Sequence, residues 1–246
     1  MAVKIYKIYI DPGHSDKDPG AVGYEVERDL NEKVAKYMRA YLRDKYVCEV
    51  KVDPVTNNSL TGVADAANEW GADLYVSIHF NAGGGDGFEV WVYSEANKPL
   101  GKIFEKHVKA IGQNSRGVKI QPGYVVLKRT NMPAVLNECA FVDNKKDIED
   151  WNEDAELKKM GIAFAKAAAE YLKLEKKTAK KTEEKVEKPV EKPVSKRVHT
   201  VVKGDSLWNI AKKYLGDGGR YPEIVKLNGL KSTVLRVGQK LTIPNK

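Results

Sequence analysis

Apolar positions in the first 174 residues change from a strand period to a helix period and back several times. Runs typical of β-strands, either alternating or continuously apolar, occupy residues 3–11, 46–53, 72–82, 87–94 and 133–144. Apolar residues recur every three or four positions, as on one face of a helix, in 30–41, 59–71, 96–112 and 155–174. This alternation predicts an α/β layer fold in which helices cover both faces of one sheet.

Two segments refine this prediction. The run 72–82 is mostly apolar on both of its faces, as expected of a strand in a sheet that is covered on both sides. Residues 117–130 hold two short runs rich in β-branched residues around Pro122 and Gly123. Since Pro-Gly favours a tight turn, we expect a pair of short strands there.

The last 49 residues also alternate between strand and helix patterns, over a shorter length. Their pattern predicts strand, helix, helix and strand at 198–203, 205–215, 220–229 and 239–244. Between the two patterned regions, 175–197 is dense in charge, contains the repeat VEKP-VEKP and has few core-forming residues. Such a composition indicates an extended linker. We therefore expect a first domain at 1–174, a linker at 175–197 and a small βααβ module at 198–246.

Charge is distributed unevenly between these parts. The chain has a net charge of +8, yet residues 1–174 carry 24 Lys and Arg against 26 Asp and Glu. All of the basic excess therefore lies in the linker and the small module. This asymmetry favours attraction of the C-terminal part to an anionic polymer, and both nucleic acid and bacterial cell wall have that character.

The sequence also bears on where the protein acts. No stretch approaches the roughly 18 consecutive apolar residues of a membrane span, so we expect no membrane insertion. The N-terminal residues lack the basic start, apolar stretch and cleavage site of a signal peptide. We therefore expect synthesis in the cytoplasm and exit by another route.

Four residues in the first domain suggest metal chemistry. His14 and His79 each stand at the end of a predicted strand, Glu27 precedes the helix that begins near Leu30, and Glu138 interrupts an apolar strand. Two histidines and one carboxylate form a catalytic zinc set when a coordination position is left open for water, and a second carboxylate can act as base. The alternatives are ordinary surface histidines and, for Glu27, a favourable charge at a helix N-terminus.

Four blocks in this order, DPGHSDKDPGA, ERDLN, YVSIHFNA and MPAVLNECAFVDN, resemble the zinc-dependent N-acetylmuramoyl-L-alanine amidases over about residues 4–172. The resemblance implies a twisted, mostly parallel sheet, Zn²⁺ bound by His14, Glu27 and His79, and Glu138 as the catalytic carboxylate. Glu25 is the alternative to Glu27. The family usually has glycine where this chain has Ser15.

Further roles follow from position. Asn81 lies two residues after His79 on the same strand face, so we expect it to contact substrate. We expect Asp11 to orient a ligand histidine.

The implied function is peptidoglycan hydrolysis, in which zinc-activated water cleaves the amide between N-acetylmuramic acid and L-alanine. Glu138 would take the proton of that water and pass it to the leaving amine. The alternatives are a zinc peptidase that cuts the stem peptide and a non-catalytic protein that binds cell wall or nucleic acid.

Residues 198–245 are similar to a LysM module through the blocks VKGDSLWNIA, LNGL and VGQKLTIP. This resemblance implies binding to a glycan that contains N-acetylglucosamine, and not to nucleic acid. The matching loop positions are Gly204, Asp205, Ser206, Leu207, Asn228, Gly229 and Leu230. Together the two resemblances describe an endolysin-like protein that reaches the wall after release through a phage holin pore or on cell lysis, with a bacterial or prophage amidase as the alternative origin.

Overall fold

The computed structural model describes residues 4–54, 59–177, 197–202, 204–230, 233 and 235–244. The chain divides into two compact units, Met1–Lys180 and Lys181–Lys246. Most of the predicted linker, 178–196, lies outside the described residues. The first three linker residues pair with the first unit, because the Lys177 amide donates to the Lys45 carbonyl and the Val47 amide donates to the Glu175 carbonyl.

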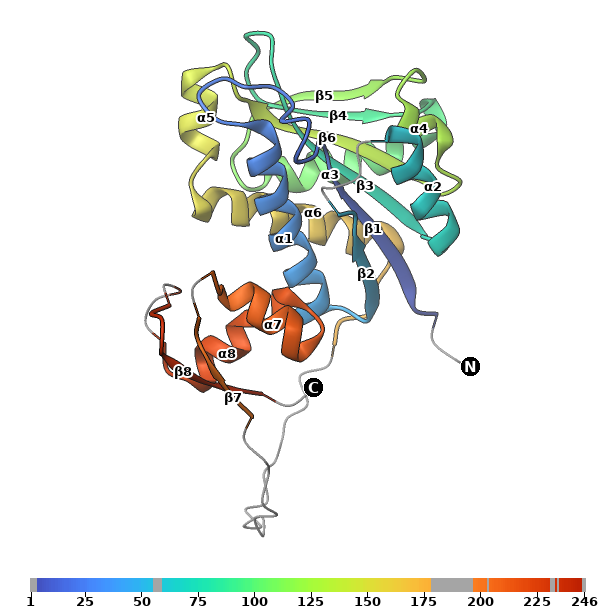
Figure 1. The fold of residues 1–246 in the computed structure, drawn as a ribbon. Helices are drawn as coiled ribbons and strands as arrows, with labels where there is room; N and C mark the ends of the chain where they lie inside the picture. Colours follow the sequence, from blue (N-terminus) through green and yellow to red (C-terminus); the bar gives the residue numbers. More distant parts are fainter. Residues whose placement is uncertain are drawn as a thin grey trace. The chain divides into compact units, whose positions relative to one another are not determined.

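A six-stranded sheet forms the centre of the first unit (Figure 1). Its strands are β1 (Tyr6–Pro12), β2 (Cys48–Val52), β3 (Leu74–Asn81), β4 (Phe88–Val92), β5 (Ser115–Ile120) and β6 (Ala134–Phe141). Their order across the sheet is β2-β1-β3-β6-β4-β5. The first four in this order are parallel, β4 is antiparallel to β6, and β5 is parallel to β4. The prediction of a mostly parallel sheet is confirmed.

Helices cover both faces of the sheet, as predicted (Figure 1). They are α1 (Glu27–Lys45), α2 (Leu60–Trp70), α3 (Lys98–Lys109), α4 (Val125–Arg129), α5 (Lys145–Trp151) and α6 (Asp154–Leu172), with a 3-10 turn, η1, at Glu95–Asn97. Helices α1, α3 and α6 pack over one face around Ile8 and Phe164. Helices α2 and α4 pack over the other face around Tyr9 and Val63.

Strand β1 shows how the sequence supplies both faces. Successive side chains of a strand point to opposite sides of the sheet. Accordingly, Ile8 and Ile10 belong to the larger core, whereas Tyr9 belongs to the smaller core, and all three are fully buried. The uninterrupted apolar run Ile8–Ile10 therefore suits a strand that is covered on both faces.

The contact between α1 and α6 depends on one glycine. A Cβ atom at Gly161 would lie 2.6 Å from the Val34 carbonyl oxygen and 2.7 Å from the Tyr37 Cβ. Both neighbours belong to α1, and one is backbone, so neither can move without shifting the helix. The absence of a side chain at Gly161 allows the two longest helices to pack closely.

The prediction for 117–130 is wrong in its second half. Strand β5 forms as expected, but it pairs with β4, and Val125–Arg129 is the short helix α4. Val126 and Leu127 enter the smaller core beside α2. The β propensity of the Val-Val-Leu run is thus overridden by tertiary packing.

Helix α5 was not predicted from the sequence. The Asn144 side chain caps its N-terminus by accepting hydrogen bonds from the amides of Lys146 and Asp147. The Asp147 carboxylate is buried and accepts hydrogen bonds from the amides of Gly87 and Phe141. The N-cap Asn144 is the only sequence feature that marks this helix. A helix of seven residues is too short to show a clear helical period of apolar residues.

The second unit forms the predicted strand–helix–helix–strand module. Its elements are β7 (Arg197–Thr200), α7 (Leu207–Leu215), a 3-10 turn η2 (Gly218–Arg220), α8 (Tyr221–Leu227) and β8 (Lys240–Ile243). The two strands pair antiparallel, and a small core forms around Leu207, Ile210 and Ile224. Among the described residues of the whole chain, no helix is both long enough and apolar enough to span a bilayer.

We expect Gly161→Val to lower the free energy of unfolding of the first unit by about 2–3 kcal/mol, because the new side chain overlaps α1. Urea denaturation followed by tryptophan fluorescence measures this change. Lys166→Val is the matched control, since it places the same side chain on the exposed face of α6. It should cost less than about 1 kcal/mol, and equal losses for the two variants would contradict the packing argument.

Candidate metal and catalytic site

The predicted site residues meet in one cleft of ≈ 540 Å³ in the first unit. The cleft lies where β1, β3 and β6 present their C-terminal halves, an edge of parallel sheets that commonly carries function. It is lined by His14, Glu27, His79, Asn81, Glu138 and neighbouring residues of the loop after β1, of α2 and of the segment around Tyr124. The chain thus brings together residues that are up to 124 positions apart in sequence.

His14 occupies a turn that directly follows β1. Its backbone has φ 72, a left-handed conformation that is uncommon for a residue with a side chain. The turn is held by a hydrogen bond from the Gly13 amide to the Ile78 carbonyl and by another from the buried Asn31 side chain to the Gly13 carbonyl. These bonds offset the strain and direct the imidazole into the cleft.

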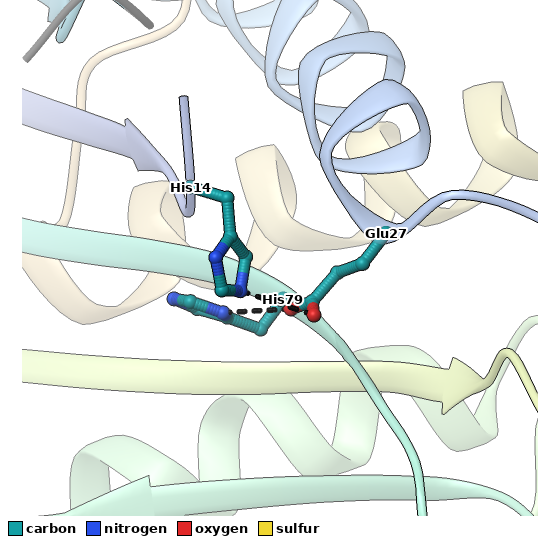
Figure 2. Close-up of side chains that lie close together, drawn as sticks. All are labelled: His14, Glu27 and His79. Carbon is teal, nitrogen blue, oxygen red and sulfur yellow. Dashed lines mark hydrogen bonds and ion pairs between the residues drawn. The ribbon is translucent and has the colours of Figure 1, made fainter. Parts of the chain in front are cut away.

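The side chains of His14, Glu27 and His79 converge on one point (Figure 2). Nε2 of His14 lies 3.0 Å from one Glu27 oxygen, and Nδ1 of His79 lies 2.9 Å from the other. The two imidazole rings meet edge to face, with their centroids 5.1 Å apart. One ligand atom from each residue lies within 4.8 Å of the other two.

The electrostatics of this triad favour a cation. Burial alone would raise the pKa of Glu27, but hydrogen bonds to both histidines outweigh burial and hold its pKa well below the usual range. Burial likewise opposes the charged form of His14, yet Glu27 and Asp18 raise the pKa of His14 to about 9. The pKa of His79 is raised in the same way by Glu27. Glu27 therefore stabilises positive charge beside it, carried either by protons on the two imidazoles or by a metal ion.

The donor set fits zinc. Two imidazole nitrogens and one carboxylate oxygen are the ligands of catalytic zinc sites, which keep a further position for water or substrate. His14, Glu27 and His79 would hold the ion. The alternative Glu25 is excluded from this group, because its carboxylate accepts a hydrogen bond from Asn152 and not from either histidine.

Two glycines make room for the side chains of His79 and Glu27. A Cβ on Gly13 would lie 2.1 Å from the His79 ring, and a Cβ on Gly20 would lie 2.5 Å from the Glu27 carboxylate. Gly20 also has φ 70, which disfavours any side chain. These positions were missed in the sequence analysis, although a Pro-Gly pair on each side of His14 was the available signal.

The carboxylate that holds His14, a predicted metal ligand, is Asp18 rather than the predicted Asp11. Asp18 Oδ2 lies 3.0 Å from His14 Nδ1, on the side of the ring away from Glu27. Such an outer partner fixes the tautomer of a ligand histidine. The Asp11 carboxylate instead accepts hydrogen bonds of 2.6 and 2.7 Å from the hydroxyls of Tyr75 and Ser77.

Glu138 stands beside the triad in the same cleft. It is directly opposite His79 in the parallel pairing of β3 and β6, so the two side chains share one face of the sheet. Within the described residues, its Oε2 is buried and makes no hydrogen bond. Burial, aided by the charges of Glu27 and Glu89 against the opposing effect of His79, raises its pKa to about 7. A carboxyl group of this pKa can exchange a proton near neutral pH.

Asn81, which the sequence predicts to contact substrate, also lines the cleft. A register shift between His79 and Asn81 interrupts the pairing with β6. The Asn81 side-chain amide donates to Glu89 at 3.3 Å, and its oxygen accepts from the Ala82 amide. Its contact with substrate stays a prediction.

The predicted glycan-binding positions lie in two loops of the second unit, and several have structural roles. Ser206 caps α7, Leu207 is buried in the small core, and Asp205 accepts hydrogen bonds from His199 and Val202. Gly204 is exposed, with φ 95.

Residues of the second loop also have structural roles. Asn228 exchanges hydrogen bonds with the backbone of Thr242, Gly229 has φ 59, and Leu230 packs against the core. Contact between these seven residues and a glycan stays a prediction.

Comparison with known proteins assigns both units. Residues 8–170 match the N-acetylmuramoyl-L-alanine amidase family, and residues 199–244 match the LysM domain. The chain is 36% identical over 181 residues to the N-acetylmuramoyl-L-alanine amidase CwlM of Bacillus licheniformis, covering 70% of this chain and 71% of that protein. It is 35% identical over 184 residues to the endolysin of Bacillus phage SPP1, covering 70% of this chain and 68% of that protein.

Solved structures agree. The catalytic domain of the amidase CwlV from Bacillus (Paenibacillus) polymyxa aligns with a TM-score of 0.66 and 27% identity, over 70% of this chain and 100% of that domain. An amidase from Clostridium difficile 630 aligns with a TM-score of 0.65 and 28% identity, over 69% of this chain and 97% of that protein. The chain therefore belongs to the N-acetylmuramoyl-L-alanine amidase family and joins its catalytic unit to a LysM domain that binds the glycan of peptidoglycan.

Proposed function

We propose that this amidase is zinc-dependent, that His14, Glu27 and His79 hold the ion, and that Glu138 is its catalytic acid and base. The observation that supports the proposal most directly is the juxtaposition of a three-donor cluster and a buried, unpartnered carboxylate oxygen in one cleft. The scissile bond is the amide between N-acetylmuramic acid and L-alanine. Cleavage there by water would release the intact stem peptide from the sugar.

The mechanism assigns each step to a residue of this chain. When bound, a zinc ion supplies Lewis acidity toward the amide carbonyl and lowers the pKa of a water molecule. Glu138 accepts a proton from the attacking water and then delivers it to the nitrogen of the leaving alanine. Its pKa of about 7 suits both transfers. Asp18 holds His14 in the tautomer that leaves Nε2 free for the metal.

We further propose that the enzyme meets the wall after release from the cell that makes it, through a phage holin pore or on cell lysis. The similarity to a phage endolysin supports this route. The second unit then acts as an anchor that holds the catalytic unit near its polymeric substrate and raises its effective concentration. The basic excess of the C-terminal part adds attraction to anionic wall components.

We expect His79→Ala to lower zinc affinity at least tenfold, because it removes one of three protein ligands. Metal content after equilibration with a zinc buffer, measured by mass spectrometry, tests this. His107→Ala is the matched control, since His107 lies on α3, pairs with Glu170 of α6 and does not line the cleft. Zinc binding by His79→Ala as tight as that of His107→Ala would contradict the ligand assignment.

Glu138→Gln should keep the fold and the zinc but lower kcat by about 10²–10⁴, because the amide cannot accept the proton. The release of stem peptide from purified peptidoglycan, followed by mass spectrometry, gives both the rate and the cleavage site. Glu25→Gln is the control and should keep wild-type activity. Peptides cut between amino acids would indicate a peptidase, and a rate near wild type for Glu138→Gln would remove Glu138 from catalysis.

Removal of 181–246 should leave hydrolysis of soluble muropeptides unchanged and slow the lysis of intact walls about 10²-fold, through the loss of effective concentration. Turbidity of a wall suspension and muropeptide cleavage are compared for both forms. The difference should shrink as salt is raised, because screening weakens the electrostatic part of wall binding. Equal lysis by the two forms at low salt would contradict the anchoring role.

A further inference from the structure

A second charged cluster lies next to Glu138, and the mechanism above does not use it. Glu89 on β4 is directly opposite Glu138 on β6, so both carboxylates are on the same face of the sheet. Glu89 is only 3% exposed. Its Oε1 accepts hydrogen bonds from Arg116 at 2.5 Å and from Lys119 at 2.6 Å, and its Oε2 accepts one from Asn81.

The two cations reach the same carboxylate because strand β5 is irregular. Residues three apart on a regular strand point to opposite faces. The pairing of β4 with β5 shifts between Phe88 and Val90, and Gly117 there has φ 91, so the strand bulges. The bulge turns Arg116 to the same face as Lys119. Re-aiming a side chain in this way is a common use of bulges beside active sites.

The cluster carries one more positive charge than Glu89 neutralises. Arg116 uses Nε toward Glu89, and its guanidinium lies 5.3 Å from the Phe141 ring centroid, which limits its rotation. Lys119 is held in the same way over Trp91 at 5.0 Å. The Arg116 side chain is 44% exposed, so a ligand can reach part of it while Nε stays bonded to Glu89. A planar fork of this kind matches a carboxylate.

The cluster is connected to the cleft on two sides. Asn81, which donates to Glu89, lines the cleft, and so does Glu138, the strand neighbour of Glu89. Trp91, under Lys119, contacts the ring of Tyr124, another cleft residue, at 5.6 Å. A ligand that extends from the cleft across β4 toward β5 therefore meets Arg116 and Lys119.

We infer that Arg116 and Lys119 form a subsite for a free carboxylate on the peptide part of the substrate. This inference rests on the proposed amidase function, in which the sugar side brings no carboxylate because its lactyl carboxyl is part of the scissile amide. The peptide side is an acidic chain, and its carboxylates are the groups that this cation pair can recognise. Glu89 is a positioning residue, since it orders both cations and tethers Asn81.

The test compares two synthetic N-acetylmuramoyl dipeptides that differ in one group. In one, the residue after alanine carries a free main-chain carboxylate, and in the other this group is a carboxamide. Wild-type enzyme should cleave the carboxylate form with a kcat/KM about tenfold higher, as expected for one charge-assisted contact at a half-exposed site. Arg116→Gln should abolish this preference by slowing only the carboxylate substrate, and Arg116→Lys should restore part of it.

Controls separate this inference from the function on which it rests. Lys146→Gln removes an exposed cation of α5 and should keep the full preference. Calorimetric binding of both dipeptides to Glu138→Gln should show the same difference in Kd without turnover. If neither dipeptide is cleaved by wild type, the proposed function fails. If both are cleaved with equal kcat/KM, or if Arg116→Gln slows both equally, the carboxylate subsite is refuted while the amidase function stands.

Discussion

The catalytic unit is organised around one buried carboxylate. Glu27 is 4% exposed, and it binds an imidazole with each of its oxygens. Burying a lone carboxylate is strongly unfavourable, so its negative charge has to be matched by protons on the histidines or by a metal ion. The rest of the site serves this requirement: Gly13 and Gly20 leave space for the rings, the Ala21 amide donates to Glu27, and Asp18 holds His14 from outside.

The sheet supplies the accuracy that such a site needs. His79, Glu138 and Glu89 lie side by side on three neighbouring strands, in a row fixed by backbone pairing. Strand positions are held by packing on both faces and shift less than loop positions do. Glu138 is thus placed between His79 and the charged cluster around Glu89. Its raised pKa follows from this position, because burial and the charges of Glu27 and Glu89 all favour its protonated form.

Much of the site could be predicted from sequence, and the limit is physical. His14 and His79 end apolar strands and Glu138 interrupts one, so their positions in the hydrophobic pattern distinguish them from ordinary polar residues. The residues that sequence did not indicate make contacts that depend on the folded backbone. Asp18 approaches His14 only because the backbone turns with φ 72, and Arg116 shares a face with Lys119 only because β5 bulges. The fold was likewise predictable only in part. The alternation of strand and helix patterns predicted the layers. Helix α4 forms because of its packing in the smaller core, although its β-branched residues favour a strand.

In the small unit, residues of the blocks that resemble a sugar-binding module also stabilise the fold. Leu207 and Asn228 stand in the blocks that resemble a sugar-binding module, yet one is a core residue and the other fastens α8 to β8 by hydrogen bonds. A unit of this size has little core, so loop residues near a binding surface must also hold the fold together. We therefore expect backbone groups and exposed side chains of the two loops to make the glycan contacts. Replacing Leu207 or Asn228 would then weaken binding by loosening the loops, and the loss would be accompanied by a lower melting temperature of the module.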